Sequence, residues 1–157
     1  MAQTSIGSAI NNAMHISQHQ NDVRLLVCNN DETVKVFSLP SLDHITSINL
    51  HVAVNGLSVS PDGNKMVAVG DSNQAFLYSI SGNNYRLVSA LPTMNDAGFS
   101  CAWDLGSEKF AVACQDGYAC VWDVRMLNRK LALIESTQRS QKGAVRCIKF
   151  TRANSMD

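Results

Sequence analysis

Features that mark several specialised protein classes are missing from this chain of 157 residues. It has no C-x-x-C pair and no N-x-S/T sequon, and its five cysteines make an odd count, so a disulfide framework is not expected. No apolar run approaches the roughly 20 residues of a membrane helix. The polar N-terminal stretch has no basic residue before Arg24, which does not fit a secretory or transit signal. We therefore expect reduced thiols in the cytoplasm, the nucleus or both.

Recognisable catalytic patterns are also absent. The sequence contains no Gly-rich phosphate loop, no G-x-S-x-G and no H-E-x-x-H,. His15 and His19 stand four apart, and we interpret them as polar loop histidines rather than metal ligands. Cys114 and Cys120 flank a predicted turn, and we interpret them as buried thiols in adjacent strands. We expect no enzymatic activity, no catalytic residue, no metal and no cofactor.

Charge is balanced overall but unevenly distributed. Residues 1–124 hold five Lys or Arg against eleven Asp or Glu, whereas residues 125–152, the basic block, hold eight against one. The block is either an anion-binding surface for phosphoinositide or nucleic acid, or a solvated face whose acidic complement lies elsewhere. Its one aromatic residue, Phe150, is too few for a base-stacking surface. We therefore favour the solvated face.

The sequence repeats with a period of a little over 40 residues. Three segments carry an aromatic residue at positions 41 and then 44 apart, namely Phe37, Tyr78 and Trp122. A triplet of turn-forming residues precedes each aromatic residue,. A third register has spacings of 43, 44 and 47 and is formed by Ile16, Val59, Trp103 and Phe150. Three registers that agree on one period indicate tandem structural units.

Within each period the apolar residues follow the pattern of short β-strands. Residues 55–60 and 146–151 alternate between apolar and polar types, and the apolar runs 25–28, 66–69 and 110–114 are typical of more deeply buried strands,. Turn formers separate these segments,. Each period therefore predicts about four short strands.

One segment gives a conflicting signal. Leu127, Leu131 and Ile134 have helical spacing,. The repeat register instead predicts a strand near residues 130–136, because the corresponding slots, 44–49 and 85–91, also have strand character. We predict the strand.

The repeat resembles the WD-repeat family. Phe110–Arg125, with the sequence F-A-V-A-C-Q-D-G-Y-A-C-V-W-D-V-R, is the best single match, and V-S-P-D-G at 59–63 is a second,. The likeness runs from about Ile10 onward and extends to a fungal and plant WD-repeat group with a domain of unknown function. It implies an all-β, YVTN-like propeller of four-stranded antiparallel blades. In that pattern Asp116, Trp122 and Asp123 are structural repeat residues.

Dividing the chain by the period gives an incomplete ring of about 3.5 blades, whereas closed propellers have typically four to eight. We expect a disordered N-terminus at 1–9, blade 1 at 10–50, blade 2 at 51–95 and blade 3 at 96–141. Residues 142–157 would hold the first strand of a truncated fourth blade, at 144–150. The remaining blades, or a second chain, would close the ring, so we expect the chain to be a fragment of a longer protein.

The resemblance implies a protein–protein interaction scaffold whose partners are other proteins. Such partners would dock on the turns after each second strand and the loops before each first strand. The candidate partner-binding residues there are Asp31, Glu32, His51, Ser72, Asn73, Asn95, Asp96, Asp116, Tyr118, Arg139 and Lys142.

Arg125 suggests an alternative function. The stretch Phe110–Arg125 resembles the box by which some WD-repeat proteins dock on the adaptor of a cullin-RING ubiquitin ligase, with Asp116, Trp122, Asp123 and Arg125 at the matching places. The resemblance then implies a substrate-receptor subunit, with the guanidinium of Arg125 as the docking group. Anion binding through the basic block is a second alternative.

Overall fold

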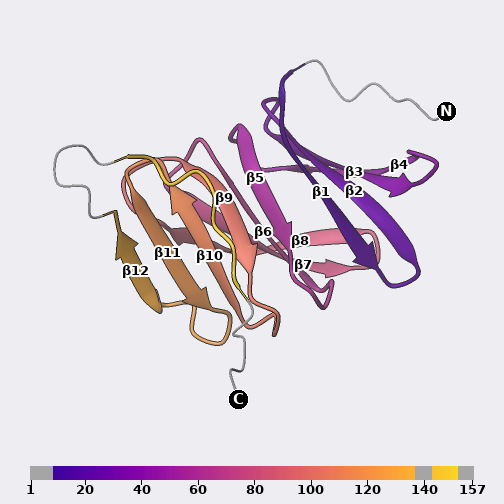
Figure 1. The fold of residues 1–157 in the computed structure, drawn as a ribbon. Helices are drawn as coiled ribbons and strands as arrows, with labels where there is room; N and C mark the ends of the chain where they lie inside the picture. The colour runs from indigo at the N-terminus through magenta and orange to yellow at the C-terminus, as the bar shows by residue number, and fades with distance from the viewer. Residues whose placement is uncertain (1–8, 137–142, 152–157) are drawn as a thin grey trace.

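The computed structural model describes residues 9–136 and 143–151, and in this part of the chain it is all β, as predicted (Figure 1). The strands form three four-stranded antiparallel sheets, each built from consecutive strands. Sheet 1 contains β1 (Asn11–His19), β2 (Asp22–Asn29), β3 (Thr33–Leu39) and β4 (His44–Asn49). Sheet 2 contains β5 (Val54–Val59), β6 (Lys65–Gly70), β7 (Gln74–Ser81) and β8 (Asn84–Pro92). Sheet 3 contains β9 (Gly98–Trp103), β10 (Lys109–Cys114), β11 (Tyr118–Asp123) and β12 (Ala132–Glu135).

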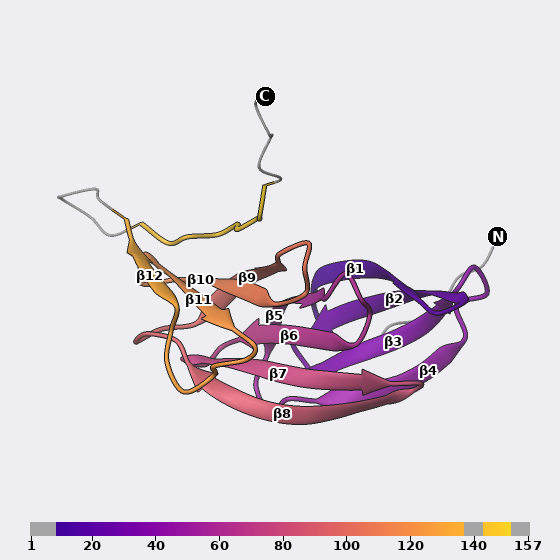
Figure 2. The same ribbon diagram turned by 90° about the horizontal axis from the view of Figure 1, so that it is seen from below.

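The three sheets lie face to face in chain order, with sheet 2 between the other two (Figures 1 and 2). One core cluster joins sheets 1 and 2, and a second joins sheets 2 and 3. Both faces of sheet 2 are therefore buried, which explains why its central strands are nearly all apolar,. Within the described residues, no helix is long and apolar enough to cross a membrane.

The sequence repeat is also a repeat of side-chain position. In sheet 1, Leu25 of β2 pairs with Ile16 on one side and Phe37 on the other. In the next two sheets the same places are held by the triads Val59–Met66–Tyr78 and Trp103–Phe110–Trp122. In the third triad, the Phe110 ring lies 5.2 Å from Trp103 and 5.4 Å from Trp122 between centroids. The predicted equivalence of Phe37, Tyr78 and Trp122 is confirmed.

The first strands of the sheets approach each other closely, and glycine permits this. A Cβ on Gly56 would lie 2.8 Å from the carbonyl oxygen of Phe99, and a Cβ on Gly98 would lie 2.6 Å from the Cβ of Val69. Real Cβ atoms do not come this close to such neighbours, so any larger residue must push the sheets apart. Trp103 adds a direct link, since its indole N–H donates to the carbonyl of Ser58 at 2.9 Å.

Two basic side chains are buried between sheets 1 and 2 near the β1–β2 turn. Arg24 is only 3% exposed and donates to the Gly82 carbonyl at 2.9 Å, to Asn83 Oδ1 at 2.8 Å and to the Tyr85 hydroxyl at 3.3 Å. His19 is also buried, and its Nε2 atom has no hydrogen-bond partner. This end of the interface is therefore polar, and it fixes the β7–β8 turn against sheet 1.

Two sequence predictions about strands have different outcomes. The strand near 130–136 is present as β12, so the helical spacing of Leu127, Leu131 and Ile134 does not indicate a helix. The strand predicted at 144–150 is wrong, because no strand is assigned within residues 143–151. Val145 N does donate to the Cys114 carbonyl at 3.0 Å, but the described residues contain no second strand of a fourth sheet. Residues 1–8 of the predicted disordered N-terminus (1–9) lie outside the described part.

Candidate interaction face

Strand direction brings one set of turns and loops to a single end of the molecule. Each sheet runs up and down, so the turns β2–β3, β6–β7 and β10–β11 lie at the end where β1, β5 and β9 begin (Figure 1). The β4–β5 and β8–β9 loops lie at this end too. We call this end the turn face. Ten of the twelve partner-binding residues predicted by sequence lie outside the undescribed segments, and nine of these ten belong to the turn face: Asp31, Glu32, His51, Ser72, Asn73, Asn95, Asp96, Asp116 and Tyr118.

The turn face is acidic among the residues that the structure describes. Its carboxylates come from all three sheets and the loops between them: Asp31, Glu32, Asp71, Asp96, Asp116 and Glu135. Two described basic residues lie at the same end: Lys35, which forms an ion pair with Asp31, and Arg146, whose guanidinium lies over the Phe99 ring. The six described carboxylates outnumber these two basic residues, so the described part of this end has an excess of negative charge.

Local hydrogen bonds fix the first of these turns. Asp31 accepts from the backbone N–H of Thr33 at 3.2 Å and from the Thr33 hydroxyl at 2.5 Å, as well as from Lys35. Burial alone would raise the pKa of Asp31, but the hydrogen bonds from Lys35 and Thr33, with the charge of Lys35, lower it overall,. Glu32 follows with φ of 69° and His51 with φ of 60°. Both side chains are exposed, and their left-handed backbone is held in place by neighbouring hydrogen bonds.

The turns of the other two sheets are fixed in related ways. Asp116 Oδ2 accepts from the backbone N–H of Asn95 at 2.9 Å, which ties the β10–β11 turn to the β8–β9 loop. Asp96 accepts from the N–H of Ala97 at 2.8 Å. The Tyr118 hydroxyl donates to Glu135 at 3.1 Å. The exposed Asn73 uses its carbonyl to hold Thr93 N at 2.9 Å, while Ser72 is half-buried.

A pair of asparagines that sequence reasoning missed links the sheets along this end. The Asn12 amide donates to the Val54 carbonyl of sheet 2 at 2.9 Å. One repeat later, the Asn55 amide donates to the Gly98 carbonyl of sheet 3 at 3.1 Å, and also to Asp71 at 2.9 Å. The signal was available, because Asn12 and Asn55 are 43 positions apart. In sheet 3 the corresponding residue is Phe99, and the Arg146 guanidinium lies 5.0 Å from its ring centroid.

Arg125 lies at the opposite end of the molecule from the turn face, where three of its five guanidinium N–H groups have carboxylate partners and its side chain is 62% exposed,. Its backbone N–H and Nε donate to Asp123 Oδ1, each at 2.9 Å, and its Nη2 donates to Oδ2 at 2.6 Å. Nη1 reaches Glu108 at 3.4 Å. The hydrogen bonds from Arg125 hold the pKa of Asp123 well below its usual range,. Asp123 thus fixes the end of β11, while Trp122 beside it is buried in the core.

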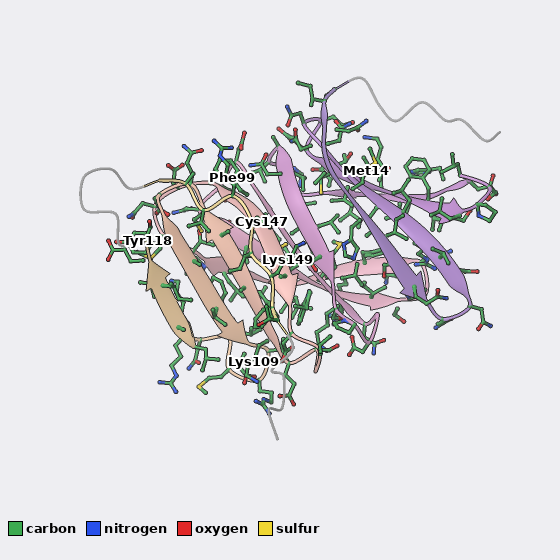
Figure 3. All side chains as sticks on the ribbon, viewed as in Figure 1. Met14, Phe99, Lys109, Tyr118, Cys147 and Lys149 are labelled. Carbon is green, nitrogen blue, oxygen red and sulfur yellow. The ribbon has the colours of Figure 1, made fainter. Side chains whose placement is uncertain are left out.

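The basic block does not form one patch among the described residues. Lys130 lies 5.7 Å from the ring centroid of Trp122, and Arg129 donates to the Met126 sulfur. Arg146 and Lys149 lie on the C-terminal segment that runs past sheet 3 (Figure 3). Arg139, Lys142 and Arg152 lie outside the described residues.

The two histidines are not loop residues, so that interpretation was wrong. His15 is half-buried within β1, and its Nε2 accepts from the Val59 N–H at 3.4 Å. His19 is the last residue of β1 and is buried. Alternation places both on the face of sheet 1 that packs on sheet 2. No group of His, Cys, Asp or Glu within the described residues could hold a metal ion.

The cysteines are free thiols, and all but Cys147 are buried. Burial raises the pKa of Cys28 to about 12,. Cys114 and Cys120 do approach one another, and the hydrogen bond between their thiols, together with burial, raises the pKa of Cys120. Burial also raises the pKa of Cys101, so Cys28, Cys101 and Cys120 are poor nucleophiles, whereas the hydrogen bond with Cys120 lowers the pKa of the buried Cys114 thiol.

Tandem four-stranded sheets with an acidic turn face define a class of all-β repeat chain. Residues 2–99 match the family described as "Lethal giant larvae (Lgl) like, C-terminal", and the chain belongs to that family. An uncharacterized protein of Schizosaccharomyces pombe is 34% identical over 148 residues, which are 92% of this chain and 43% of the relative. An uncharacterized protein of Saccharomyces cerevisiae is 24% identical over 190 aligned residues, with 96% and 26% covered. The chain thus spans less than half the length of these relatives.

The family match corrects the resemblance drawn from sequence. Assignment to the WD-repeat family, including its fungal and plant group, was wrong, and the YVTN-like designation falls with it. The best WD-like stretch, Phe110–Arg125, lies outside the matched residues 2–99. Its Asp116 and Trp122 serve a turn and a core contact that tandem antiparallel sheets need whatever their family.

Proposed function

We propose that the chain is a non-enzymatic protein-interaction module whose turn face binds a basic segment of a partner protein. The observation that carries this proposal is the set of carboxylates that sheets 1, 2 and 3 and the loops between them present at one end. A surface with one sign of charge attracts a partner segment of the opposite sign and orients it before contact. Membership of the Lgl-like C-terminal family agrees with an interaction role.

The chemistry of the polar groups supports binding rather than catalysis. The carboxylates of Asp31, Asp71, Asp96 and Asp116 already accept hydrogen bonds that shape the turns. Four of the five cysteines are buried away from any substrate. Because these carboxylates hold the turns in place, they form a rigid surface. We therefore propose that the turn face binds a partner and does not catalyse a reaction.

A charge-reversal experiment tests this function. The double variant Glu32→Lys, Asp96→Lys is compared with Asp22→Lys, Asp43→Lys, which makes the same change in net charge with carboxylates at the opposite end. The probe is a fluorescein-labelled peptide rich in lysine and arginine, and binding is followed by anisotropy. We expect the turn-face variant to weaken binding about tenfold or more. Equal weakening by both double variants would show only a response to net charge and would end the proposal.

The ubiquitin-ligase and anion-binding functions receive no comparable support. The guanidinium of Arg125 is held by Asp123 and reaches Glu108, so a docking partner would have to share it with these two carboxylates. Anion binding through the basic block requires one continuous patch, whereas its described members point to different partners. We therefore keep the acidic turn face as the proposed binding surface.

We also propose that the three sheets are consecutive blades of a longer, ring-like array completed by chain outside these residues. Leu57 and Val59 on β5 are 8% and 9% exposed, because they pack on sheet 1. Their counterparts in sheet 1, Met14 and Ile16, are 63% and 64% exposed. Repeat units bury their apolar faces against neighbours, so these residues favour a further sheet in front of sheet 1. The greater length of the relatives provides the chain for it.

A reducing compartment is part of the same proposal. All five cysteines are free thiols, which fits the cytoplasm, the nucleus or both.

A further inference from the structure

A polar groove of about 400 Å³ lies between sheets 1 and 2, on the side of their last strands. One wall consists of four consecutive residues of β4, Thr46–Asn49. The other wall includes Tyr78 of β7 with Tyr85 and Leu87 of β8. His51 at the turn face closes one end. The volume lies within the range of ordinary ligand sites in proteins.

The sequence of the first wall shows which part of β4 faces the groove. Successive side chains of a strand point to opposite faces of the sheet. Ile48 belongs to the core between the sheets, so the lining by all four consecutive residues indicates that the groove also runs along the edge of the strand. β4 is the outer strand of sheet 1 and pairs with β3 alone. Its outer row of backbone N–H and C=O groups has no strand beside it, and we infer that this row borders the groove.

The edge of β4 lacks the usual protection against strand pairing. Edge strands commonly carry charged residues or proline that discourage an added strand. The last strands of the other two sheets follow this rule, since β8 contains Arg86 and Pro92 and β12 contains Glu135. The first strands β5 and β9 carry no such residue, but they pack against strands of the neighbouring sheets. β4 reads H-I-T-S-I-N, with no Asp, Glu, Lys, Arg or Pro. Its two isoleucines and one threonine favour extended structure.

The second wall supplies a place for an apolar side chain. Leu87 is 48% exposed and lies in the groove with the rings of Tyr78 and Tyr85. None of the lining side chains is Asp, Glu, Lys or Arg. An uncharged occupant therefore avoids the cost of placing an unpaired charge between the sheets.

We infer that this groove binds an uncharged, extended peptide segment that adds to β4 as a fifth strand of sheet 1. Backbone hydrogen bonds to β4 supply the affinity, and alternate apolar side chains enter the space beside Leu87, Tyr78 and Tyr85, as in other strand-addition complexes. The groove has no acidic lining residue, in contrast to the turn face, and His51 is the one residue named for the turn face that also lines it. It adds a second partner class to the proposed function and does not depend on the acidic residues.

The first test uses a synthetic probe with the complete chain. The probe is a fluorescein-labelled peptide of about eight residues, the length of an ordinary strand, that alternates valine or leucine with threonine. Two further peptides carry N-methyl groups on alternate residues, one in each of the two possible frames. Only one frame removes the N–H groups that face β4, so we expect one methylated peptide to lose binding and the other to keep it. Equal behaviour of the two frames, or no binding of the parent peptide at about 1 mM, overturns the inference.

The second test uses two neighbouring residues as a matched pair. Leu87 and Val88 are 48% and 50% exposed on the same strand, but only Leu87 lines the groove. We expect Leu87→Asp to weaken peptide binding about tenfold or more and Val88→Asp to leave it unchanged. Circular dichroism checks that both variants are folded. Equal effects of the two substitutions would place the peptide elsewhere. Weak dependence on salt distinguishes this site from the turn face, whose failure in its own test would leave this result unaffected.

Discussion

Arg24 shows how one residue can control an interface between sheets. Its guanidinium is buried and forms no ion pair with a carboxylate among the described residues. Three oxygen atoms of the β7–β8 hairpin accept hydrogen bonds from it. An arginine head satisfies several acceptors in one plane, which lysine cannot do. Arg24 therefore fixes the β7–β8 hairpin against the end of sheet 1 that carries the β1–β2 turn.

We predict that Arg24→Ala lowers the free energy of unfolding by about 3 kcal/mol, because it leaves buried acceptors unpaired. Arg86→Ala, an exposed change on β8, should cost no more than about 0.5 kcal/mol. Urea titration followed by tryptophan fluorescence measures both. A similar cost for the two variants would contradict the role given to Arg24.

His19 should make stability depend on pH. Burial lowers its pKa, and the nearby charge of Arg24 lowers it further; burial also lowers the pKa of His15. The unfolded chain, with histidine pKa near 6.5, therefore binds more protons than the folded chain in mildly acidic solution. Stability should be complete above this value and should fall as the pH drops from about 7 towards 5.

The measurement is the urea midpoint at each pH for the parent chain and for His15→Gln and His19→Gln. Each substitution should flatten the profile, and the double variant should flatten it most. The carboxylates with lowered pKa, such as Asp31 and Asp62, act only below about pH 4, so they do not enter this window. A parent profile that is level from pH 7 to 5 would rule out the assignment.

The roles of some single residues could be predicted from the sequence, and the roles of others could not. The aromatic triads were foreseeable, because Phe37, Tyr78 and Trp122 repeat with the period and their chemistry suits a core. The roles of Arg24 and Arg125 were not, since the first depends on a hairpin 58 residues away and the second on an aspartate two residues before it. Charge and spacing do not reveal whether an arginine is buried or already paired.

At the scale of the element, glycine sets the spacing of the sheets. Gly98 has Val69 at 2.6 Å from an ideal Cβ position, whereas nothing lies within 4 Å of the corresponding position at Gly143. We predict that Gly98→Ala destabilises the fold by about 2 kcal/mol through overpacking, while Gly143→Ala is nearly neutral. Thermal unfolding of both variants decides the matter, and a neutral Gly98→Ala would mean that sheets 2 and 3 adjust freely.

Strands were predictable where neighbours of the same design surround them. The slots at 44–49 and 85–91 correspond to β4 and β8, and β12 forms despite a helical spacing of leucines. The segment 143–151 has the same alternation but no strand assignment. Alternation shows that a segment suits a strand, whereas the strand itself requires partners for its backbone groups.

At the scale of the whole molecule, the outer face of sheet 1 has a measurable consequence. Met14 and Ile16 are exposed at positions where the other sheets have buried contacts. Met14 is labelled on β1 in Figure 3. We predict that Met14→Ser with Ile16→Ser reduces self-association of this chain in sedimentation velocity without lowering its own free energy of unfolding. The same pair should destabilise the longer protein, in which the proposed further sheet covers this face. Unchanged self-association would contradict this prediction.

Family and fold were predictable to different degrees. Repeat length and strand number followed from the period of the apolar residues, so the three four-stranded sheets were expected. The family was not, because turn aspartates and a strand tryptophan meet physical needs shared by many tandem-sheet proteins. The match to the Lgl-like C-terminal family covers residues 2–99. The aspartate and tryptophan that most resemble the WD pattern, Asp116 and Trp122, lie outside that range.

Each sheet is one uninterrupted stretch of chain, and its strands are neighbours in sequence order. A ribosome therefore releases all the partners of a sheet before the next sheet begins, and domains generally fold in the order in which they are made. Synthesis itself can then set the order of assembly, with each finished sheet serving as the template on which the next one condenses.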